Sequence, residues 1–471
     1  SSDDLVSAIR PIYEPLFAET KDGLEYYLAD KLDISEDGLT YTLHINDKAT
    51  WSDGEPVTVK DIKFTIDYGV LVYGGPTSFT KVNGGEVQIN EIDDKTMEFV
   101  LPSVYDNYVR TLSQFYPMPA HAFDNDPSKI NDSTYFKTPG MATSGAYVVS
   151  EINEDSFVYT ARDDYYRGTP SVKKVVIKTI GSGSTKQIEF ENGGIDYMRV
   201  TSAEDLKKYK EESDKYNMYS ISEARLNYLQ LNPHGPVMST LSQDARKAIF
   251  LALDKDAIVD FAWGSNELAE PANSLITPDQ SIYNKDCKGY NFNLEEAKKL
   301  AKSSGLEGKE LTYIYNSDRA NMEAVATVVQ QQLAEIGVTV NIESCDTSTF
   351  FPRFFASKDK ELATTWDLGT NGWDSQRGSN CGQAISYFTN RLCDCGYSDE
   401  VSGLAQKAIG TADAKEKQEL WNTIQDKALE ECWEYPLTYT NFVMVSQKNV
   451  TGLDGSSVVP EFIDYLSIHV D

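Results

Sequence analysis

The sequence is poor in positive charge and in long apolar runs. Against 73 aspartate and glutamate residues it has 43 lysines and arginines, which leaves a formal net charge of −30. A field of that sign repels phosphate backbones and anionic lipid headgroups, so we expect no nucleic-acid partner and no docking to a membrane through a basic patch. No apolar run approaches the roughly 20 residues that a membrane-spanning helix needs. The 471 residues are enough for two or three globular domains.

Histidine is equally scarce, and the common catalytic motifs are missing. The four histidines lie far apart, and none belongs to a His-x-x-x-His pattern. There is no Gly-x-Ser-x-Gly motif and no dinucleotide fingerprint. Acidic pairs such as Asp93–Asp94 could imitate the two carboxylates of a glycosidase, but in so acidic a chain we expect them at the surface. The sequence therefore predicts a protein that is not an enzyme and needs no cofactor and no metal, with a glycan-acting hydrolase as the alternative.

Cysteine is sparse too, with six residues in the chain. Three of them, Cys381, Cys393 and Cys395, fall close together. The single residue between Cys393 and Cys395, and the lack of a nearby histidine, do not fit a structural zinc site. Free thiols and a disulfide in an exported protein both agree with this pattern. The chain opens without a basic or an apolar leader, so we expect that an export signal, if the protein has one, is absent from this sequence.

What the sequence does contain is a regular succession of strand and helix patterns. Apolar residues at every second position predict a strand over 39–45, and Thr58 followed by Asp61 predicts the start of a helix. Strands are also predicted at 96–101, 147–149, 175–177 and 437–445, and helices at 242–253, 293–300 and within 399–431.

The clearest topological prediction lies after position 310. A strand over 311–315 is followed by a helix over 322–336 that ends at Gly337, and then by a strand over 338–342. A strand–helix–strand run of this length is typical of a right-handed parallel crossover. Together with 28 tyrosines, 19 phenylalanines and 6 tryptophans, this pattern favours a multi-domain binding protein whose ligand lies in a cleft between domains.

Two stretches near the start of the chain form a recognisable motif. Gly-Leu-Thr-Tyr-Thr-Leu at 38–43 precedes Trp-Ser-Asp-Gly-Glu-Pro-Val-Thr-Val-Lys-Asp-Ile-Lys-Phe at 51–64. This motif is similar to the signature of the family 5 extracellular solute-binding proteins, the dipeptide- and oligopeptide-binding components of ABC importers. Stretches that resemble later parts of the same family follow, in the family's order, at 144–147, 162–166, 244–249, 253–259, 296–300 and 332–337.

The resemblance implies an α/β fold: a two-lobed clamshell of the periplasmic-binding-protein type, type II, from the large cluster with an extra accessory domain. It implies a first lobe of residues 1–18, 142–230 and 440–471, an accessory α+β domain of residues 19–141, and a second lobe of residues 231–439. Family members bend at a hinge and close, because a ligand contacts both lobes only in the closed form. They normally begin with a strand that we expect to be missing here.

The resemblance also implies where a ligand binds. In the family a Gly-Trp pair is followed, three residues after the tryptophan, by an aspartate that pairs with the ammonium group of a peptide. Here Asn371, Gly372 and Trp373 match, but the position three after the tryptophan is Gln376, and Asp374 lies one after it. A neutral amide cannot give an ammonium group the charge-assisted bond of a carboxylate. Either Asp374 takes over this role, or the ligand has no free amine.

Further candidates for ligand contact lie elsewhere in the chain. The family binds the peptide backbone with residues just before its first helix, which points to Ser2 and Asp3 here. Arg353, in a phenylalanine-rich stretch, is either a partner for a ligand carboxylate or an arginine in a surface ion pair. Trp373 either stacks on the ligand or packs its own loop.

The function implied by the resemblance is that of an extracytoplasmic substrate-binding protein of an ABC transporter. We expect a monomer that captures di- or oligopeptides and delivers them to a permease in the membrane. Oligosaccharides and metal chelates, which other family members bind, are the alternative ligands. A cell-surface lipoprotein and a free periplasmic protein both agree with the sequence, and so do transport and sensing.

Overall fold

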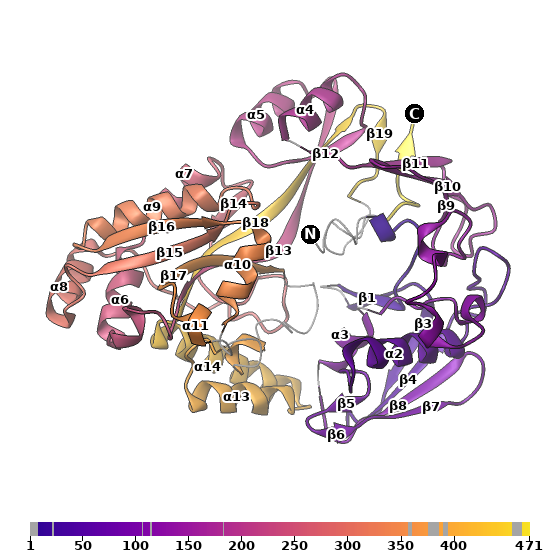
Figure 1. The fold of residues 1–471 in the computed structure, drawn as a ribbon, viewed down its shortest axis with the longest axis horizontal. Helices are drawn as coiled ribbons and strands as arrows, with labels where there is room; N and C mark the ends of the chain where they lie inside the picture. The colour runs from indigo at the N-terminus through magenta and orange to yellow at the C-terminus, as the bar shows by residue number, and fades with distance from the viewer. Residues whose placement is uncertain are drawn as a thin grey trace.

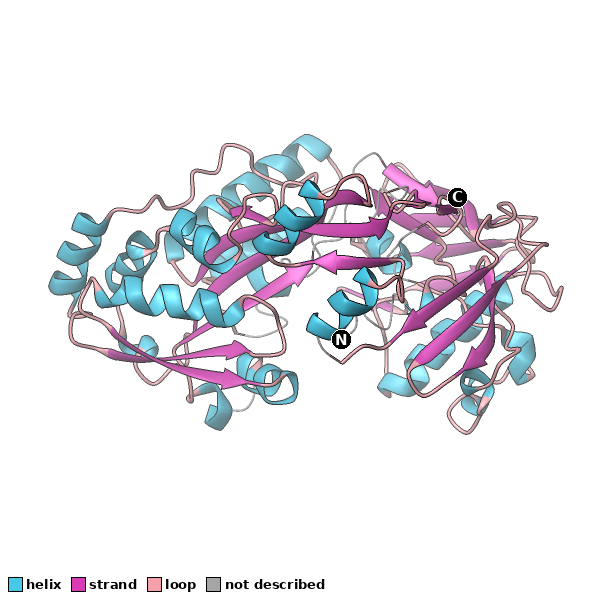
Figure 2. Ribbon diagram, turned by 90° about the horizontal axis from the view of Figure 1, so that it is seen from above, coloured by secondary structure: helices cyan, strands magenta, loops and turns pink. Residues whose placement is uncertain are grey.

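Two long antiparallel strands connect the two halves of the molecule in the computed structural model (Figure 1). They are β13 (Tyr216–Leu231) and β18 (Glu434–Gln447). Figure 2 shows strands with helices beside them in both halves. The halves are therefore joined through a sheet. The structure describes residues 8–20, 23–105, 107–113, 115–181, 183–356, 360–374, 386–389, 394–454 and 464–471.

The connecting strands belong to a seven-stranded sheet with the order β12-β18-β13-β17-β15-β16, in which β14 pairs with β18. β12, β18, β13 and β17 pair antiparallel, whereas β15 is parallel to both β16 and β17. Helices and this mixed sheet confirm the α/β class. The other strands of the sheet are β12 (Tyr197–Val200), β14 (Ala269–Pro271), β15 (Glu310–Asn316), β16 (Thr339–Cys345) and β17 (Leu368–Asp374).

The predicted strand–helix–strand crossover is confirmed. α9 (Met322–Ala334) connects β15 to β16, and Val325, Val329 and Leu333 on its predicted apolar face are fully buried. Gly337 ends the crossover helix region with a φ of +77°, a conformation that glycine adopts without strain. The other helices of this half are α6 (Gln243–Ala252), α7 (Lys255–Ala262), α8 (Leu294–Ser304), α10 (Thr347–Phe354), α11 (Lys360–Ala363), α13 (Asp399–Ile409) and α14 (Ala414–Glu431).

The N-terminal half contains a four-stranded antiparallel sheet with the order β3-β4-β8-β7. In β4 (Thr40–Ile45), Tyr41, Leu43 and Ile45 are buried and the residues between them are half-buried, as their alternation predicts. The other strands of this sheet are β3 (Ala29–Ile34), β7 (Gln88–Glu91) and β8 (Thr96–Val100).

The motif at 51–64 has a structural role in this half. Thr58 and Asp61 form the predicted capping box at the start of α2 (Val59–Tyr73). The buried carboxylate of Asp61 accepts hydrogen bonds from the backbone nitrogens of Thr58 (2.8 Å) and Ala120 (2.9 Å) and from the indole nitrogen of Trp51 (3.3 Å). One side chain thus ties the helix start to two distant segments.

Smaller elements complete the fold. A three-stranded antiparallel sheet has the order β11-β10-β9, and three two-stranded ribbons pair β1 with β2, β5 with β6 and β19 with β20. The strands are β1 (Phe17–Thr20), β2 (Gly23–Tyr26), β5 (Lys81–Val82), β6 (Gly85–Glu86), β9 (Tyr147–Ile152), β10 (Ser156–Ala161), β11 (Lys174–Lys178), β19 (Val450–Thr451) and β20 (His469–Val470). The helices are α3 (Tyr108–Ser113), α4 (Gly183–Glu191) and α5 (Ala203–Glu211), and the 3-10 turns are η1 (Ala120–Phe123), η2 (Pro127–Lys129), η3 (Tyr135–Lys137) and η4 (Met238–Thr240).

The predicted lobe boundaries stay a prediction. The four-stranded sheet lies within 19–141, but the seven-stranded sheet runs without a break across the expected boundaries near 230 and 440. None of the helices in the described part of the chain is both long and apolar enough to span a bilayer.

The described cysteines favour the free-thiol alternative. Cys287, Cys345, Cys395 and Cys432 are buried and unbridged. Cys381 and Cys393, the other members of the predicted cluster, lie outside the described residues, so a disulfide between them stays an open prediction.

Candidate ligand-binding cavity

A cavity of about 660 Å³ lies where the two halves meet along the connecting strands. Residues of β12, of both connecting strands and of the loops before α9 and around α10 line it. We call this space the interlobe cavity. Its lining residues are Arg199, Val200, Thr201, Glu223, Arg225, Asn227, Trp263, Leu268, Asp318, Arg319, Ala320, Asn321, Met322, Thr347, Phe351, Thr440 and Asn441.

A β-bulge in β13 shapes one wall of the interlobe cavity. Ser222 lies opposite Asn441 and Arg225 lies opposite Thr440, so two extra residues are inserted between them. One of these, Ala224, has a φ of +49°, which residues other than glycine rarely adopt. Bulges of this kind bend a strand and redirect its side chains next to functional sites. This bulge lies at the point where Glu223 and Arg225 face the cavity.

Glu223 is the centre of a compact ion-pair network. Its two carboxylate oxygens lie 2.8 and 2.9 Å from Nη2 of Arg199, which comes from β12. The hydroxyl of Thr440 donates a further hydrogen bond of 2.6 Å to Glu223. The guanidinium of Arg199 also lies 4.4 Å from the ring centre of Phe442. The negative charge of Glu223 is therefore compensated within the wall.

The side chain of Arg225 lies next to Gly372 of the predicted Gly-Trp segment, which is on the neighbouring strand β17. Its Nε donates to Oδ1 of Asn227 (3.2 Å), and the amide of Asn227 donates to Oγ1 of Thr438 (3.1 Å). A β-carbon on Gly372 would lie 2.6 Å from both Nη2 of Arg225 and Oδ1 of Asn227. Only glycine leaves room at position 372 for these two side chains.

The opposite wall comes from the half that carries α9 and α10. The carboxylate of Asp318 accepts a hydrogen bond of 2.8 Å from the backbone nitrogen of Thr347, and this bond lowers the pKa of Asp318. The guanidinium of Arg319 lies 6.0 Å from the ring centre of Phe351. Asn321, with a φ of +68°, precedes α9 and makes no side-chain cap. The positive end of the helix dipole of α9 therefore points toward the cavity wall.

The predicted segment 371–374 forms the end of β17 and pairs with β13, with Gly372 opposite Asn227 and Asp374 opposite Arg225. The Trp373 ring is 1% exposed and packs 5.1 Å from Tyr228 and 4.5 Å from Tyr387. The structure thus shows the packing role expected for Trp373, and its contact with ligand stays a prediction.

Asn371 precedes the Gly-Trp pair on the same strand. The side-chain oxygen of Asn371 is buried, and no described residue gives it a hydrogen-bond partner. The side chain of Asp374, and the residues Gln376, Ser2 and Asp3, lie outside the described part of the structure. Their expected contacts with ligand are untested.

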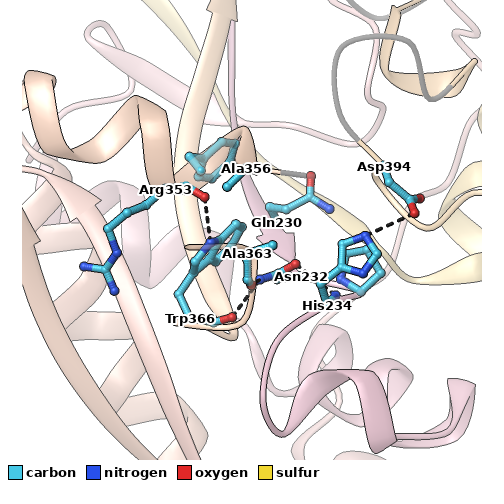
Figure 3. Close-up of a pocket in the computed structure, with 10 residues that line it drawn as sticks. Gln230, Asn232, His234, Arg353, Ala356, Ala363, Trp366 and Asp394 are labelled. Carbon is cyan, nitrogen blue, oxygen red and sulfur yellow. Dashed lines mark hydrogen bonds and ion pairs between the residues drawn. The ribbon is translucent and has the colours of Figure 1, made fainter. Parts of the chain in front are cut away.

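Arg353 lies away from the interlobe cavity, on α10. Both terminal nitrogens of its guanidinium lie 3.0 Å from Oε2 of Glu343, which is the ion pair expected as its alternative role. Figure 3 shows the guanidinium pointing away from a small pocket that the backbone of Arg353 borders. That pocket, bordered also by Trp366 and by the His234–Asp394 ion pair, has a volume of about 10 Å³. It has room for one water molecule at most.

A second cavity lies between the N-terminal half and α13. The turn between β5 and β6 (Asn83 and Gly84) and Gln406 and Ile409 of α13 line this space of about 570 Å³. In Figure 1 the β5–β6 ribbon and α13 face each other. The half-buried ring of Tyr105 packs against the hydrophobic cores of both halves. The halves therefore also approach each other at a distance from the connecting strands.

The residues that build the interlobe cavity were missed by sequence reasoning. Arg199, Glu223, Arg225 and Arg319 stand in ordinary strand or loop sequence, without a motif around them. The only signal available was the position of Arg225 next to the leucine- and tyrosine-rich stretch 226–231, and that signal does not reveal a bulge.

The geometry favours binding over chemistry. Among the described residues there is no group of three or more His, Cys, Asp or Glu side chains placed to hold a metal ion. The two carboxylates of the cavity wall are Glu223, held by Arg199, and Asp318, whose pKa is lowered. A glycosidase needs a carboxyl group with a raised pKa as its general acid. Neither residue is arranged for that role.

A cavity beside the strands that connect two halves is typical of a protein that closes over a solute. The chain belongs to the bacterial extracellular solute-binding proteins, family 5, whose Middle model matches residues 23–391. This family binds solutes and does not transform them, which overrules the alternative of a hydrolase. Its members are extracellular or periplasmic substrate-binding components of ABC transporters, so a ligand and a permease are the partners of this chain.

Individual relatives agree with this assignment. The chain is 22% identical over 461 residues to the probable D,D-dipeptide-binding periplasmic protein DdpA of Escherichia coli, with 94% of this chain and 85% of that protein covered. The solved structure of the ABC transporter substrate-binding protein CtaP of Listeria monocytogenes is 27% identical, with a TM-score of 0.89 over 100% of this chain and 95% of that one. The putative peptide-binding protein AppA of Clostridium difficile is 26% identical, with a TM-score of 0.87 over 99% and 96%. The fold is thus shared over its full length.

Proposed function

We propose that this protein captures short peptides in the interlobe cavity and delivers them to the permease of an ABC importer. The observation that carries the proposal is the cavity itself, about 660 Å³ in volume and lined by the strands that connect the halves and by the loops beside α9 and α10. This volume is in the range of about 300–1,000 Å³ that is typical of small-molecule sites. A guest of that size contacts both walls at once, and such contacts drive closure.

The polar groups of the wall suit a peptide backbone. Thr201, Asn321, Thr347, Thr440 and Asn441 line the cavity, and hydroxyl and amide side chains can both donate and accept hydrogen bonds. A peptide presents alternating N–H and C=O groups, which such a wall can satisfy in several registers.

The predicted contact residues belong to the proposal as well. Asn371, Gly372, Trp373 and Asp374 lie on the strand next to the cavity strand β13. We include them with Gln376, Ser2 and Asp3 as residues near a bound peptide.

Solved relatives at lower identity hold different ligands. AppA of Bacillus subtilis was solved with a nonapeptide (19% identity, TM-score 0.78, 99% of this chain and 94% of that one). NikZ of Campylobacter jejuni was solved with Ni(L-His) (20%, 0.79, 98% and 94%), and AgaA of A. tumefaciens with agropinic acid (20%, 0.78, 100% and 94%). At this identity the likeness shows the fold alone, so metal chelates and opines are the competing ligands that an experiment must include.

A thermal-shift screen tests the proposal. Random di-, tri- and pentapeptide libraries, Ni(L-His), an opine and an acidic oligosaccharide are added separately to the purified protein. A ligand present at 100 times its Kd stabilises the folded state by about 2.7 kcal/mol. Stabilisation by peptides alone supports the proposal, and stabilisation only by one of the other compounds overturns the choice of peptide.

The finer expectations are part of the same proposal: a monomer, anchored by a lipid or free in the periplasm, that serves transport. Light scattering at the concentrations used for binding tests the monomer. Uptake of a labelled peptide by cells with and without the gene separates transport from sensing, because a sensor leaves uptake unchanged.

A further inference from the structure

The β-bulge in β13 is fastened to several other parts of the molecule. The hydroxyl of Ser222 donates a hydrogen bond of 2.6 Å to Oδ2 of Asp279, which lies in the loop between β14 and α8. Glu223 is held by Arg199 of β12. Between Glu223 and the next paired residue stands Ala224, whose methyl group is 1% exposed. This methyl group is therefore enclosed as completely as a core side chain.

The N-terminal half supplies the residues that enclose Ala224. Ala224 forms a small buried cluster with Ala18 of β1 and with Tyr27, and the half-buried ring of Tyr116 packs against this cluster. In Figure 1, β1 lies on the side of the N-terminal half that faces the connecting strands. The cluster is thus a direct contact between the N-terminal half and one of the strands that join the halves.

Tyr27 is held firmly on its own side of this contact. The guanidiniums of Arg10 and Arg167 lie 4.3 and 4.6 Å from the centre of its ring, and its hydroxyl donates a hydrogen bond of 3.1 Å to Oε1 of Glu25. Arg167 is itself paired with Glu14 at 3.2 Å. In a close-packed interior the ring moves aside only if it displaces these charged groups. Tyr27 therefore presents a rigid surface to Ala224.

Ala224 is equally constrained on the strand. Its φ of +49° lies in the left-handed region, and its backbone nitrogen donates a hydrogen bond of 3.1 Å to Oγ of Ser222. A residue other than glycine persists in this conformation where its surroundings hold it there. A methyl group has no rotamers, so the backbone alone determines its position. Both partners of the contact are therefore fixed in place.

We infer that Ala224 and Tyr27 form a steric stop that sets how closely the N-terminal half approaches the connecting strands. Two halves that turn about a hinge come together until packed surfaces meet, and atoms in a close-packed contact do not interpenetrate. Glu223 and Arg225, on either side of Ala224, line the interlobe cavity, so the stop also sets the width of the space beside them. The stop acts in the same way for every cargo, and the inference does not depend on the proposed peptide ligand.

The experiment measures the distance between the halves in the full chain without ligand. A donor and an acceptor fluorophore are attached through unnatural amino acids in place of Lys60 of α2 and Lys415 of α14, two exposed side chains in different halves (Figure 1). A small change of angle at the connecting strands becomes a larger change of distance at these remote positions. Energy transfer is recorded for the labelled parent protein, for Ala224→Leu, for Ala224→Gly and for the control Asn125→Gly. Asn125 also has a positive φ, of +59°, but it is exposed and lies outside the cluster.

Ala224→Leu places an isobutyl group where the methyl group meets Tyr27, so it is expected to hold the halves apart and to lower the transfer efficiency. Ala224→Gly removes the methyl group and lets the halves come closer, so the efficiency rises. Asn125→Gly relieves the same kind of backbone strain and leaves the efficiency unchanged, which separates the effect of the contact from that of the backbone.

Shifts of opposite sign in the two Ala224 variants support the inference, because a contact that only adds stability does not produce them. Unchanged efficiency in both variants overturns the inference. A lower efficiency in both overturns it too, because it shows a general loosening in place of a stop. Circular dichroism verifies that each variant is folded. If Ala224→Leu does not fold, Ala224→Gly decides: a higher efficiency supports the stop, and an equal or lower one overturns it.

Discussion

A β-carbon at position 372 would come within 2.6 Å of Nη2 of Arg225, so the glycine of the Gly-Trp pair and the arginine of the connecting strand determine each other's place. The contact across the sheet thus explains why position 372 is a glycine: any larger residue would displace the side chain of Arg225, which lines the cavity. This relationship joins the Gly-Trp segment, which the sequence predicted as a ligand contact, to a cavity residue that the sequence did not predict.

Replacement Gly372→Ala tests this relationship. The added methyl group must displace Arg225 and Asn227, and overpacking of this kind costs about 1–3 kcal/mol. We expect a lower free energy of unfolding in urea and a weaker affinity for peptides in calorimetry. The matched control is Gly403→Ala on α13, where a β-carbon meets nothing within 4 Å. If Gly372→Ala is as stable and binds as well as Gly403→Ala, the proposed packing of Arg225 is wrong.

The capping network of the N-terminal half provides a second prediction. Asp61→Ala removes the acceptor for the backbone nitrogens of Thr58 and Ala120 and for the indole of Trp51. Loss of a cap together with buried donors left unpaired costs ~2–4 kcal/mol. Thermal unfolding followed by circular dichroism measures this loss. Lys60→Ala, one residue earlier and exposed, is the control with an unchanged melting temperature.

The buried carboxyl of Glu434 is expected to make the stability of the folded state depend on pH. Its carboxyl is fully buried, and burial raises its pKa to about 8, although Tyr397 donates it a hydrogen bond of 2.6 Å. Because the folded state holds this proton more tightly than the unfolded chain, the stabilisation is complete below the unfolded pKa and is lost as the pH rises toward about 8. The expected slope is up to about 1.4 kcal/mol per pH unit.

Replacement Glu434→Gln keeps the shape and removes the titration. Urea unfolding of the variant between pH 5 and about 8 is expected to show a flatter profile than that of the unmodified chain. Glu430→Gln, at an exposed position of α14, keeps the original profile. Parallel profiles for Glu434→Gln and the unmodified protein contradict the assignment of this pH dependence to Glu434.

The position of Tyr105 leads to a prediction about how the two halves approach each other. Its ring contacts the hydrophobic cores of both halves, so Tyr105→Ala removes apolar contact between the halves. A loss of ~1–2 kcal/mol corresponds to roughly 5- to 30-fold weaker binding. Small-angle X-ray scattering is expected to show a larger radius of gyration for the ligand-free variant. Tyr105→Phe retains the ring and the compact shape, and an expanded Tyr105→Phe would show that the hydroxyl, not the ring, is responsible.

The sequence predicted the regular elements of the fold and much less of the site. The spacing of apolar residues predicted β4, α2, α9 and the parallel pair β15 and β16. Each of these elements buries one face, and a buried face repeats apolar residues at the period of the helix or strand. The Thr58–Asp61 cap was visible for the same local reason.

The interlobe cavity depends on contacts between distant segments, and local patterns do not contain these. Arg225 faces the cavity because β13 bulges at Ala224 and because β17 brings a glycine opposite Asn227. Arg353 lies in a phenylalanine-rich stretch that made it a more obvious candidate than Arg225, yet it pairs with Glu343 away from the cavity. Its surroundings could be recognised only once β16 and α10 were placed side by side.

The bulge at Ala224 has one further consequence. The strands that carry Glu223, Arg225 and Thr440 are the same strands that connect the halves, whereas Arg319 and Phe351 belong to a loop and a helix of one half only. Substitutions in the peripheral loop and helix can therefore reshape one wall of the cavity without touching the strands that join the halves. A substitution in the bulge would change the cavity wall and the connection between the halves together.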